Sequence, residues 1–453
     1  MNSAPFKMSL RNLSRNKRRN VATGFAIALG FSSALVLGGF MHQAENRMRA
    51  FTIYGSRTGH IAIYKKGGLV SYEGNPKKYS LNPLDLAALE RITAGMSQIQ
   101  MQGPEMVGQG LVSNGCQSTP FFATAIDPQL DWKVQQHPYN LEWNGELVNL
   151  ARGRELWEYP DDATVMAISS PIASFLHKDK PGDPPEPSAK VAAIDCQAAD
   201  AKDKLAADLT VQLAANAWNG RLSGIDADVV ANMRTSNPLY EGGFVRLPFK
   251  HLQRLYETKN ATSYSIWLKD NDHVPETVAL IEAKTKAAGL NLDVYAWDDK
   301  RLSPYFNGTM QFCNMLAWFT AAILASIVIL SVFNSATMTV IERGSEIGMM
   351  RSLGFTRRRV RVLFVIEMTM IAAISMAAGG LIGVVSFFFV NRAGIALRLP
   401  GMVEGMTLRL AVNPQIVLLS ATLIFVLAIF ASLLAVWAVA KNGIAALVSG
   451  SHR

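Results

Sequence analysis

Residues arranged for chemistry are few in this chain, and they gather in one short stretch. That stretch, from Ile341 to Gly354, reads Ile-Glu-Arg-Gly-Ser-Glu-Ile-Gly-Met-Met-Arg-Ser-Leu-Gly. The sequence has no GxxxxGK-S/T loop to cradle a nucleotide phosphate, and no HExxH or GxSxG motif. Its seven histidines are scattered and its three cysteines show no metal-ligand spacing. We therefore expect no catalytic residue, metal or cofactor in this chain, and do not expect it to be an enzyme in its own right.

A short helix is predicted inside this stretch. At about 100° per residue, Ile347, Met350 and Leu353 fall within an arc of about 120°. Glu342 and Glu346, four residues apart, stack along one edge of that arc. An apolar stripe bordered by negative charge indicates a contact site for another protein. From these residues alone, an ordinary charged loop remains the alternative.

The ends of this helix carry recognisable signals. Gly354 suits the left-handed position that follows a helix, and Thr356 is a suitable N-cap for the next one. Arg343 intrudes on the apolar arc and weakens its amphipathic character. The pattern predicts a helix, a corner and a second helix, which would convert a lateral push into motion of the attached segments.

The elements that must hold this corner are long apolar segments. The mean hydropathy of +0.15, with 49% hydrophobic and 17% charged residues, is high for a soluble protein. Four segments reach the roughly 20 residues that cross about 30 Å of hydrocarbon, and Glu367 is the only Asp, Glu, Lys or Arg in them. The predicted transmembrane helices are residues 21–43, 311–341, 362–390 and 415–440.

Lysine and arginine beside these segments predict their orientation. Residues 1–20 are expected to form an amphipathic helix, or a simple basic tail that sets the orientation. This segment and the corner at residues 342–361 each carry six Lys or Arg, so both are expected in the cytoplasm. The tail at 441–453 then returns to the same side. Residues 44–310 and the short loop 391–414 are expected outside. The net charge of +9 is explained by this asymmetry, so nucleic acid is not an expected partner.

Residues 44–310 are predicted to fold as an α+β domain of two subdomains. Between residues 178 and 208 the composition turns polar and proline-rich, which indicates a surface loop or insertion. A disulfide between Cys116 and Cys196 is possible in an oxidising compartment. Alternation and capping signals predict strands at 60–64, 121–126, 209–214, 244–247, 264–268 and 292–297, helices at 84–94, 248–257 and 274–288, and a strand followed by a helix within 165–176.

Glu367 is a candidate functional residue, because an acid inside a membrane segment is costly and is retained for a reason. It lies within two turns of the predicted cytoplasmic end of its segment. Capping or pairing with an arginine of the corner is one interpretation. A proton relay is the other.

The stretch Ile341-Glu-Arg-x-x-Glu-Ile-Gly-x-x-Arg-x-Leu-Gly354 resembles the coupling-loop motif of the MacB/FtsX/LolC-LolE family of ABC transporter permeases. Glu367 followed by Gly379, Gly380 and Gly383 is similar to the third span of that family. Other similarities point to its lipoprotein-releasing branch: Thr58-Gly-His-Ile-Ala-Ile-Tyr64, Ala125-Ile-Asp-Pro128, Gly153 and Trp297. The 178–208 insertion and the lack of a proline in 438–448 depart from that branch.

The resemblance implies a four-helix permease of the bacterial inner membrane, with its large domain in the periplasm. It implies a separate cytoplasmic ATPase, itself a dimer, that binds ATP and Mg²⁺ and docks on the corner. A second copy or a paralogous permease, membrane lipids, and a periplasmic adaptor or carrier are further implied partners. The residues expected to couple to the ATPase are Glu342, Arg343, Glu346, Ile347, Met350, Arg351 and Gly354.

The implied function is mechanical: motion driven by ATP would pass to the periplasmic domain, which would extract or export a lipoprotein or another amphiphile. One alternative is an FtsX-like regulator that activates a periplasmic cell-wall hydrolase and transports nothing. Another is a membrane-anchored sensor without ATP coupling.

Overall fold

The structure is a computed structural model, and it divides into two units. Unit 1 comprises residues 1–45, 310–397 and 406–453, and unit 2 comprises residues 46–309 and 398–405. The predicted N-terminal helix at 1–20 and tail at 441–453 lie almost wholly outside the described residues. The structure describes residues 17–148, 152–160, 163–183, 194–233, 243–397 and 406–441.

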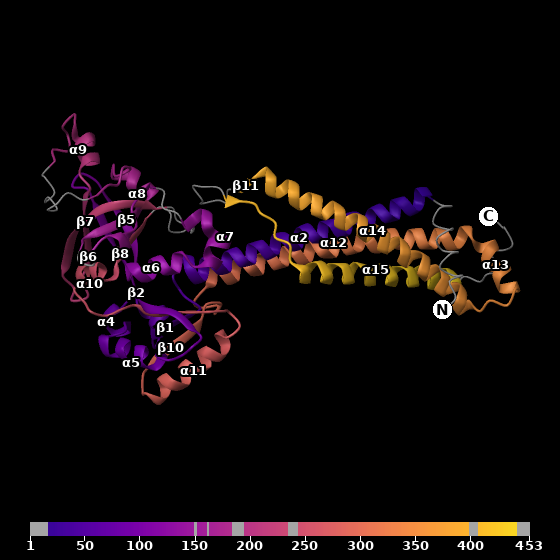
Figure 1. Cartoon of the computed structure of the whole chain (residues 1–453), viewed down its shortest axis with the longest axis horizontal. Helices are drawn as coiled ribbons and strands as arrows, with labels where there is room; N and C mark the ends of the chain where they lie inside the picture. Colours follow the sequence, from indigo (N-terminus) through magenta and orange to yellow (C-terminus); the bar gives the residue numbers. More distant parts are fainter. Residues whose placement is uncertain are drawn as a thin grey trace. The chain divides into compact units, whose positions relative to one another are not determined.

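Four long helices form the framework of unit 1 (Figure 1). They are α2 (Lys17–Ala50), α12 (Pro304–Glu342), α14 (Arg357–Ala393) and α15 (Pro414–Lys441). All four are long and apolar enough to cross a membrane by length and composition, which agrees with the four predicted segments. Both α2 and α12 extend several residues beyond the apolar segments at 21–43 and 311–341.

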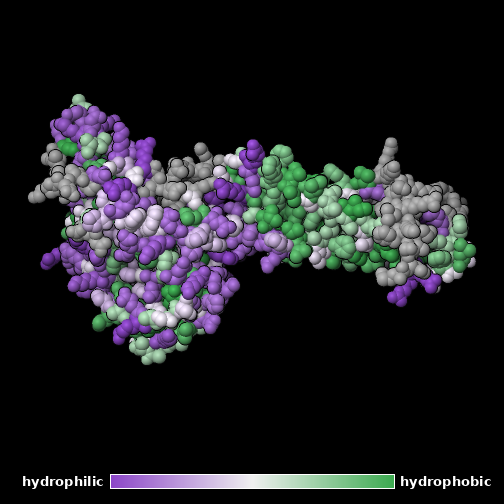
Figure 2. Space-filling view, viewed as in Figure 1, coloured by the Kyte–Doolittle hydropathy of each residue, from purple (hydrophilic) through white to green (hydrophobic). Residues whose placement is uncertain are grey.

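Unit 1 carries hydrophobic side chains on its outside. Figure 2 shows the hydrophobic surface of these helices in green. Trp318 and Leu419 are 76% and 71% exposed in the structure, and Leu381 is 67% exposed. An apolar exterior of this extent is expected where lipid or another apolar helix replaces water.

The helices of unit 1 pack closely because small residues lie where they meet. A Cβ atom on Gly379 of α14 would lie 2.5 Å from the backbone oxygen of Ala28 in α2, and one on Gly383 would lie 2.9 Å from Leu35. Helices in membranes associate through such close approach rather than by excluding water. The buried core of unit 1 is Ile27, Phe31, Leu35, Val328, Val332, Ala336, Met368, Ile371, Ala372, Ile424, Ala428, Ala431 and Ala435.

The loop predicted at 391–414 is partly described. Gly394 ends α14 in a left-handed conformation, with φ of 56°. The side chain of Asn391 donates to the backbone oxygen of Leu410 and accepts from its N–H, at 3.0 and 2.7 Å. The two short strands β11 (Ala396–Leu397) and β12 (Met406–Thr407) pair antiparallel.

Unit 2 is built on ten strands in one connected sheet. The pairings β2–β3, β3–β8, β8–β5, β5–β7, β7–β6 and β6–β2 close six of them into a ring. Strand β2 is long enough to leave the ring and pair with β9, next to β1 and β10. The strands are β1 (Ile61–Lys65), β2 (Ile99–Ser113), β3 (Ser118–Ile126), β4 (Arg152–Gly153), β5 (Val165–Ser169), β6 (Thr210–Asn216), β7 (Leu222–Met233), β8 (Phe244–Pro248), β9 (Ser263–Leu268) and β10 (Leu292–Ala296).

Short helices complete unit 2. Its buried hydrophobic residues form two main cores. One core lies in the ring with α8 and α10, and the other joins β1 and β9 to α5 and α11. The helices are η1 (Phe51–Gly55), α3 (Gly68–Ser71), α4 (Pro76–Tyr79), α5 (Pro83–Thr93), α6 (Pro128–Gln135), α7 (Pro138–Val148), η2 (Leu156–Glu158), α8 (Ser170–Phe175), α9 (Ala201–Ala207), α10 (Phe249–Leu255) and α11 (Val274–Ala287).

The predicted strands and helices of this domain are present, with ends that shift by a few residues. The signal at Asn82 is confirmed, because Asn82 caps α5 and shares a capping box with Asp85. Strands β2 and β7 were not predicted. Strand β2 contains three glycines and a proline, which are rare in strands, yet a Cβ atom on Gly110 would lie 2.4 Å from the backbone oxygen of Ala214.

The insertion at 178–208 is more firmly attached than a solvated loop. Lys178 is 1% exposed, and its ammonium donates to the backbone oxygens of Leu205 and Asp208 at the end of α9. The possible disulfide is present and joins Cys196 to Cys116, in the turn between β2 and β3. The described part of this segment is mostly exposed, as a surface loop or insertion is, but one lysine and one disulfide anchor it.

Candidate functional site

The corner between α12 and α14 is a nearly continuous helical path. Helix α12 ends at Glu342, Arg343 forms the turn, and α13 (Gly344–Ser352) follows. The N–H of Arg343 donates to the backbone oxygen of Thr339 at 3.2 Å, and the N–H of Ile347 donates to that of Arg343 at 2.9 Å. Glu342 was predicted to share a helix with Glu346, and this is wrong by two residues, since Glu342 closes α12.

Both predicted end signals of the corner are confirmed. Gly354 has φ of 89°, and the N–H of Phe355 donates to the backbone oxygen of Met350 at 3.0 Å. This is the bond of a Schellman motif, which ends α13 and satisfies a free carbonyl. Thr356 caps α14, its hydroxyl accepting from the N–H of Arg359 at 3.4 Å. The corner therefore has a defined backbone geometry rather than that of a loose loop.

One face of α13 packs inward on its own chain. Ile347 is 8% exposed and belongs to a small buried cluster with Val340 of α12 and Val360 and Phe364 of α14. Met350 packs against the same cluster. Two of the three residues of the predicted apolar stripe therefore hold α13 in place, because they cover the first turns of α14.

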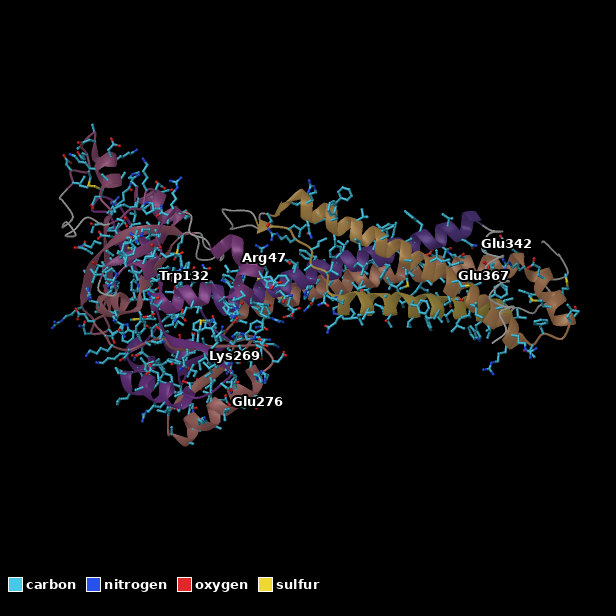
Figure 3. The ribbon with its side chains drawn as sticks, viewed as in Figure 1. Arg47, Trp132, Lys269, Glu276, Glu342 and Glu367 are labelled. Atoms are coloured by element: carbon cyan, nitrogen blue, oxygen red, sulfur yellow. A yellow bond between two sulfur atoms is a disulfide. The ribbon has the colours of Figure 1, made fainter. Side chains whose placement is uncertain are left out.

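A buried ion pair lies beside this cluster. The Nη1 atom of Arg343 donates to the Oε2 atom of Glu367 at 2.9 Å, with the two side chains 10% and 3% exposed. The Nε atom of Arg343 lies 4.0 Å from an oxygen of Glu346, whose side chain is 45% exposed. Figure 3 shows Glu342 and Glu367 at the same end of the helices. The intramembrane acid therefore pairs with an arginine of the corner, the first of the two interpretations.

Away from this inner face, α13 and the residues just after it are exposed and largely apolar. Met349 of α13 is 63% exposed, and Leu353 and Phe355, which follow its last residue, Ser352, are 74% and 45% exposed. Glu346 adds a negative charge to this face. We call Glu346, Met349, Leu353 and Phe355 the outer face of the corner. Three large apolar side chains left exposed at the end of α13 and in the turn after it indicate a surface that another protein covers.

Of the outer face, only Glu346 was among the predicted coupling residues; Met349, Leu353 and Phe355 were not. Met349 lies about 160° around the helix from Ile347, so a helical wheel places the two on opposite faces. The sequence could not say which apolar stripe points inward, because both stripes carry large side chains. Arg351 lies in α13, but its side chain is outside the described residues.

Among the side chains of the corner that the structure describes, Arg343 is paired with Glu367 and lies near Glu346. Within the part of the chain that the structure describes, no group of three or more His, Cys, Asp or Glu could hold a metal ion. The arrangement suits the binding of a partner and the transfer of its motion.

Comparison with known proteins gives a family match at this end of the chain. Residues 318–444 match the family described as FtsX-like permease C-terminal, a range that contains α13, α14 and α15 and most of α12. No curated protein matches the sequence.

Two solved structures are similar to part of the chain. One is the periplasmic region of MacB from Actinobacillus actinomycetemcomitans, with 15% identity over 54% of this chain and 92% of that chain and a TM-score of 0.33. The other is the extracellular domain of the noncanonic ABC-type transporter YknZ from Gram-positive bacteria, with 12% identity over 52% of this chain and 98% of that chain and a TM-score of 0.29.

Proposed function

We propose, from the place of this chain in the MacB/FtsX-type family of ABC transporter permeases, that it couples a separate ATPase to work done by unit 2. In this proposal the ATPase binds ATP and Mg²⁺, and the permease hydrolyses nothing. The cargo is a lipoprotein or another amphiphile, extracted from or exported across a bacterial inner membrane. Both termini and the corner face the cytoplasm, and unit 2 lies in the periplasm.

The observation that carries the proposal is the two-faced corner helix. Its inner face, with Ile347 and Met350, is packed on α12 and α14, whereas Met349 on its other side and Leu353 just after its end are exposed. A helix fixed on one side and apolar on the other offers a partner a firm point on which to push. The cytoplasmic ATPase is the partner that this geometry fits, since a force applied there reaches both attached helices.

The long helices support a mechanical role. Helix α12 is helical without interruption from Pro304 to Glu342, and α2 runs from Lys17 to Ala50 before the π-helical turn η1. Continuous helices of this length transmit displacement better than flexible linkers would. A polar path for substrate is not needed, and the one charged residue of the four apolar segments, Glu367, is neutralised by Arg343.

The same geometry would serve an FtsX-like regulator that activates a cell-wall hydrolase, because that role also requires a docked ATPase. The two functions differ in what unit 2 contacts. Purification of the full chain from its native membrane, with crosslinking on the unit 2 side, separates them. A lipoprotein or lipoprotein carrier bound to unit 2 supports release, and a hydrolase supports regulation.

The docking proposal is tested by charge substitution on the outer face. We expect the double variant Met349→Glu, Leu353→Glu to reduce co-purification of the ABC ATPase at least tenfold, because it places two carboxylates in an apolar contact. The matched control is Leu222→Glu in unit 2, where the parent side chain is 77% exposed and no ATPase is expected to dock. Equal amounts of ATPase with the double variant and with wild type would contradict the proposal.

A further inference from the structure

The contacts that join α13 to α14 follow a single stripe of α14. The stripe consists of Val360, Phe364 and Glu367, which are spaced at i, i+4 and i+7 and so share one face of the helix. Val360 and Phe364 are buried against Ile347, and Glu367 is bonded to Arg343. Helix α13 is therefore fastened to α14 over about two turns, by packing at the near end and by an ion pair at the far end.

The ion pair is costly to keep in this place, which suggests a role beyond stability. Two charges removed from water recover little net energy from each other, and apolar residues of similar size often pack as well. An ion pair adds direction, because the planar guanidinium bonds a carboxylate only in a narrow range of orientations. Arg343 lies in the turn itself, so this bond fixes the angle between α13 and α14.

The environment of Arg343 differs on its two sides. Glu367 is 2.9 Å away and buried, whereas Glu346 is 4.0 Å away and half exposed on the outer face. The buried carboxylate makes the shorter contact, and its side chain is shielded from water and salt. Arg343 is therefore held to Glu367 of α14 rather than to the exposed Glu346 of α13.

We propose that α13 and the first three turns of α14 move as one body, locked by the Arg343–Glu367 ion pair. Helix α12 meets this body at the turn beside Arg343 and through Val340, which packs with Ile347, Val360 and Phe364. Because this contact is small, a push on α13 would rotate α14 relative to α12 about it. The push would thus enter unit 1 through the third apolar helix. This inference rests on the proposed function, since it takes the outer face as the place where an ATPase pushes.

Distances between spin labels test the lock in the full chain assembled with its ATPase. In a Cys313→Ser background, one label is placed at Ser352→Cys on α13. A second is placed at Ile374→Cys on α14 or at Ile327→Cys on α12, positions that are 61% and 51% exposed. Labelled chains are diluted with unlabelled ones, so that only distances within one chain are measured.

The expected result is a 352–374 distance that stays the same between the nucleotide-free and ATP-trapped states, while the 352–327 distance changes. Glu367→Gln should broaden the 352–374 distance, and the reversed pair Arg343→Glu, Glu367→Arg should restore it. Cargo moved per ATP hydrolysed should fall at least tenfold in Glu367→Gln and recover in the reversed pair. A wild-type 352–374 distance that changes as much as the 352–327 distance would overturn the proposal.

Failure of the proposed function and failure of the ion-pair lock give different results. If no ATPase associates with the wild-type chain, the proposed function fails, and the nucleotide-free labels still decide whether the ion pair locks the two helices. If Glu367→Gln does not fold, Arg343→Lys takes its place, because it keeps the charge and loses the planar fork. An unbroadened 352–374 distance in that variant overturns the lock.

Discussion

Each unit of the molecule buries an ion-pair cluster, and the two are built differently. In unit 1, Arg343 and Glu367 join a turn to a neighbouring helix, and the exposed Glu346 lies 4.0 Å from the arginine. In unit 2, Asp131 of α6 holds two arginines, Arg57 at 2.7 Å and Arg246 of β8 at 3.3 Å. The first cluster includes the exposed carboxylate of Glu346. The second is closed, because all three of its charged side chains are buried.

Further contacts hold the unit 2 cluster in place. The side chain of Gln135 adds a third bond to Asp131, at 2.9 Å. Arg57 has φ of 61°, which a residue with a side chain keeps only where its surroundings hold it. Burial alone would raise the pKa of Asp131, but Arg57 and Arg246 hold that pKa below its usual value. The buried charges of unit 2 thus form a closed, fully paired cluster, whereas those of unit 1 form the pair that we propose directs movement.

The largest expected effect follows from removing Asp131. Asp131→Ala leaves two buried arginines without a counter-charge, which should cost unit 2 about 3–5 kcal/mol of unfolding free energy. Hydrogen exchange of β9 peptides in the full chain, read by mass spectrometry, measures this. The matched control is Asp270→Asn, an exposed carboxylate paired with His273, which should leave exchange unchanged. If the two variants changed hydrogen exchange equally, buried and exposed ion pairs would not differ in their contribution to the stability of unit 2.

A smaller loss is expected in unit 1. Glu367→Gln should lower the stability of α13 by about 1–3 kcal/mol, because the freed Arg343 retains Glu346 nearby and its long side chain reaches toward water. Local hydrogen exchange of residues 344–352 reports this change, while exchange in unit 2 serves as the internal reference. A loss as large as that of Asp131→Ala would mean that the unit 1 pair is equally closed.

Glu105, on β2 near Asp131 and Arg57, makes the stability of unit 2 depend on pH. Burial raises the pKa of Glu105 to about 8, although Arg57 acts in the opposite direction. The folded state therefore keeps a proton that the unfolded chain loses, so stability falls between about pH 4.5 and pH 8 by at most about 1.4 kcal/mol per pH unit.

Glu105→Gln should remove that slope and leave the contribution of Asp131 unchanged. Asp131 has a lowered pKa, so its contribution is lost only below about pH 3.8, outside the window of Glu105. Denaturation of the full chain at a series of pH values measures both. A slope that persists in Glu105→Gln would assign the pH dependence to another group.

Much of the framework could be read from the sequence, because it depends on local rules. Four uncharged runs of sufficient length predict four apolar helices, and Gly354 and Thr356 predict the ends on either side of the corner. Most strands of unit 2 follow from alternation. Strand β2 was not predicted because its glycines are crowded by residues distant in the sequence, Leu130, Tyr256 and Ala214, and no local pattern records that crowding.

The sequence alone determined that a charged helix lies between two apolar ones, and that a single acid lies within the apolar segments. Both could be predicted because hydrophobicity, charge and helix ends are properties of neighbouring residues. Only the tertiary structure decided which stripe of α13 is covered and that Arg343 is the partner of Glu367. Both depend on how α14 returns past the corner, and contacts between residues distant along the chain are set by packing rather than by local preference.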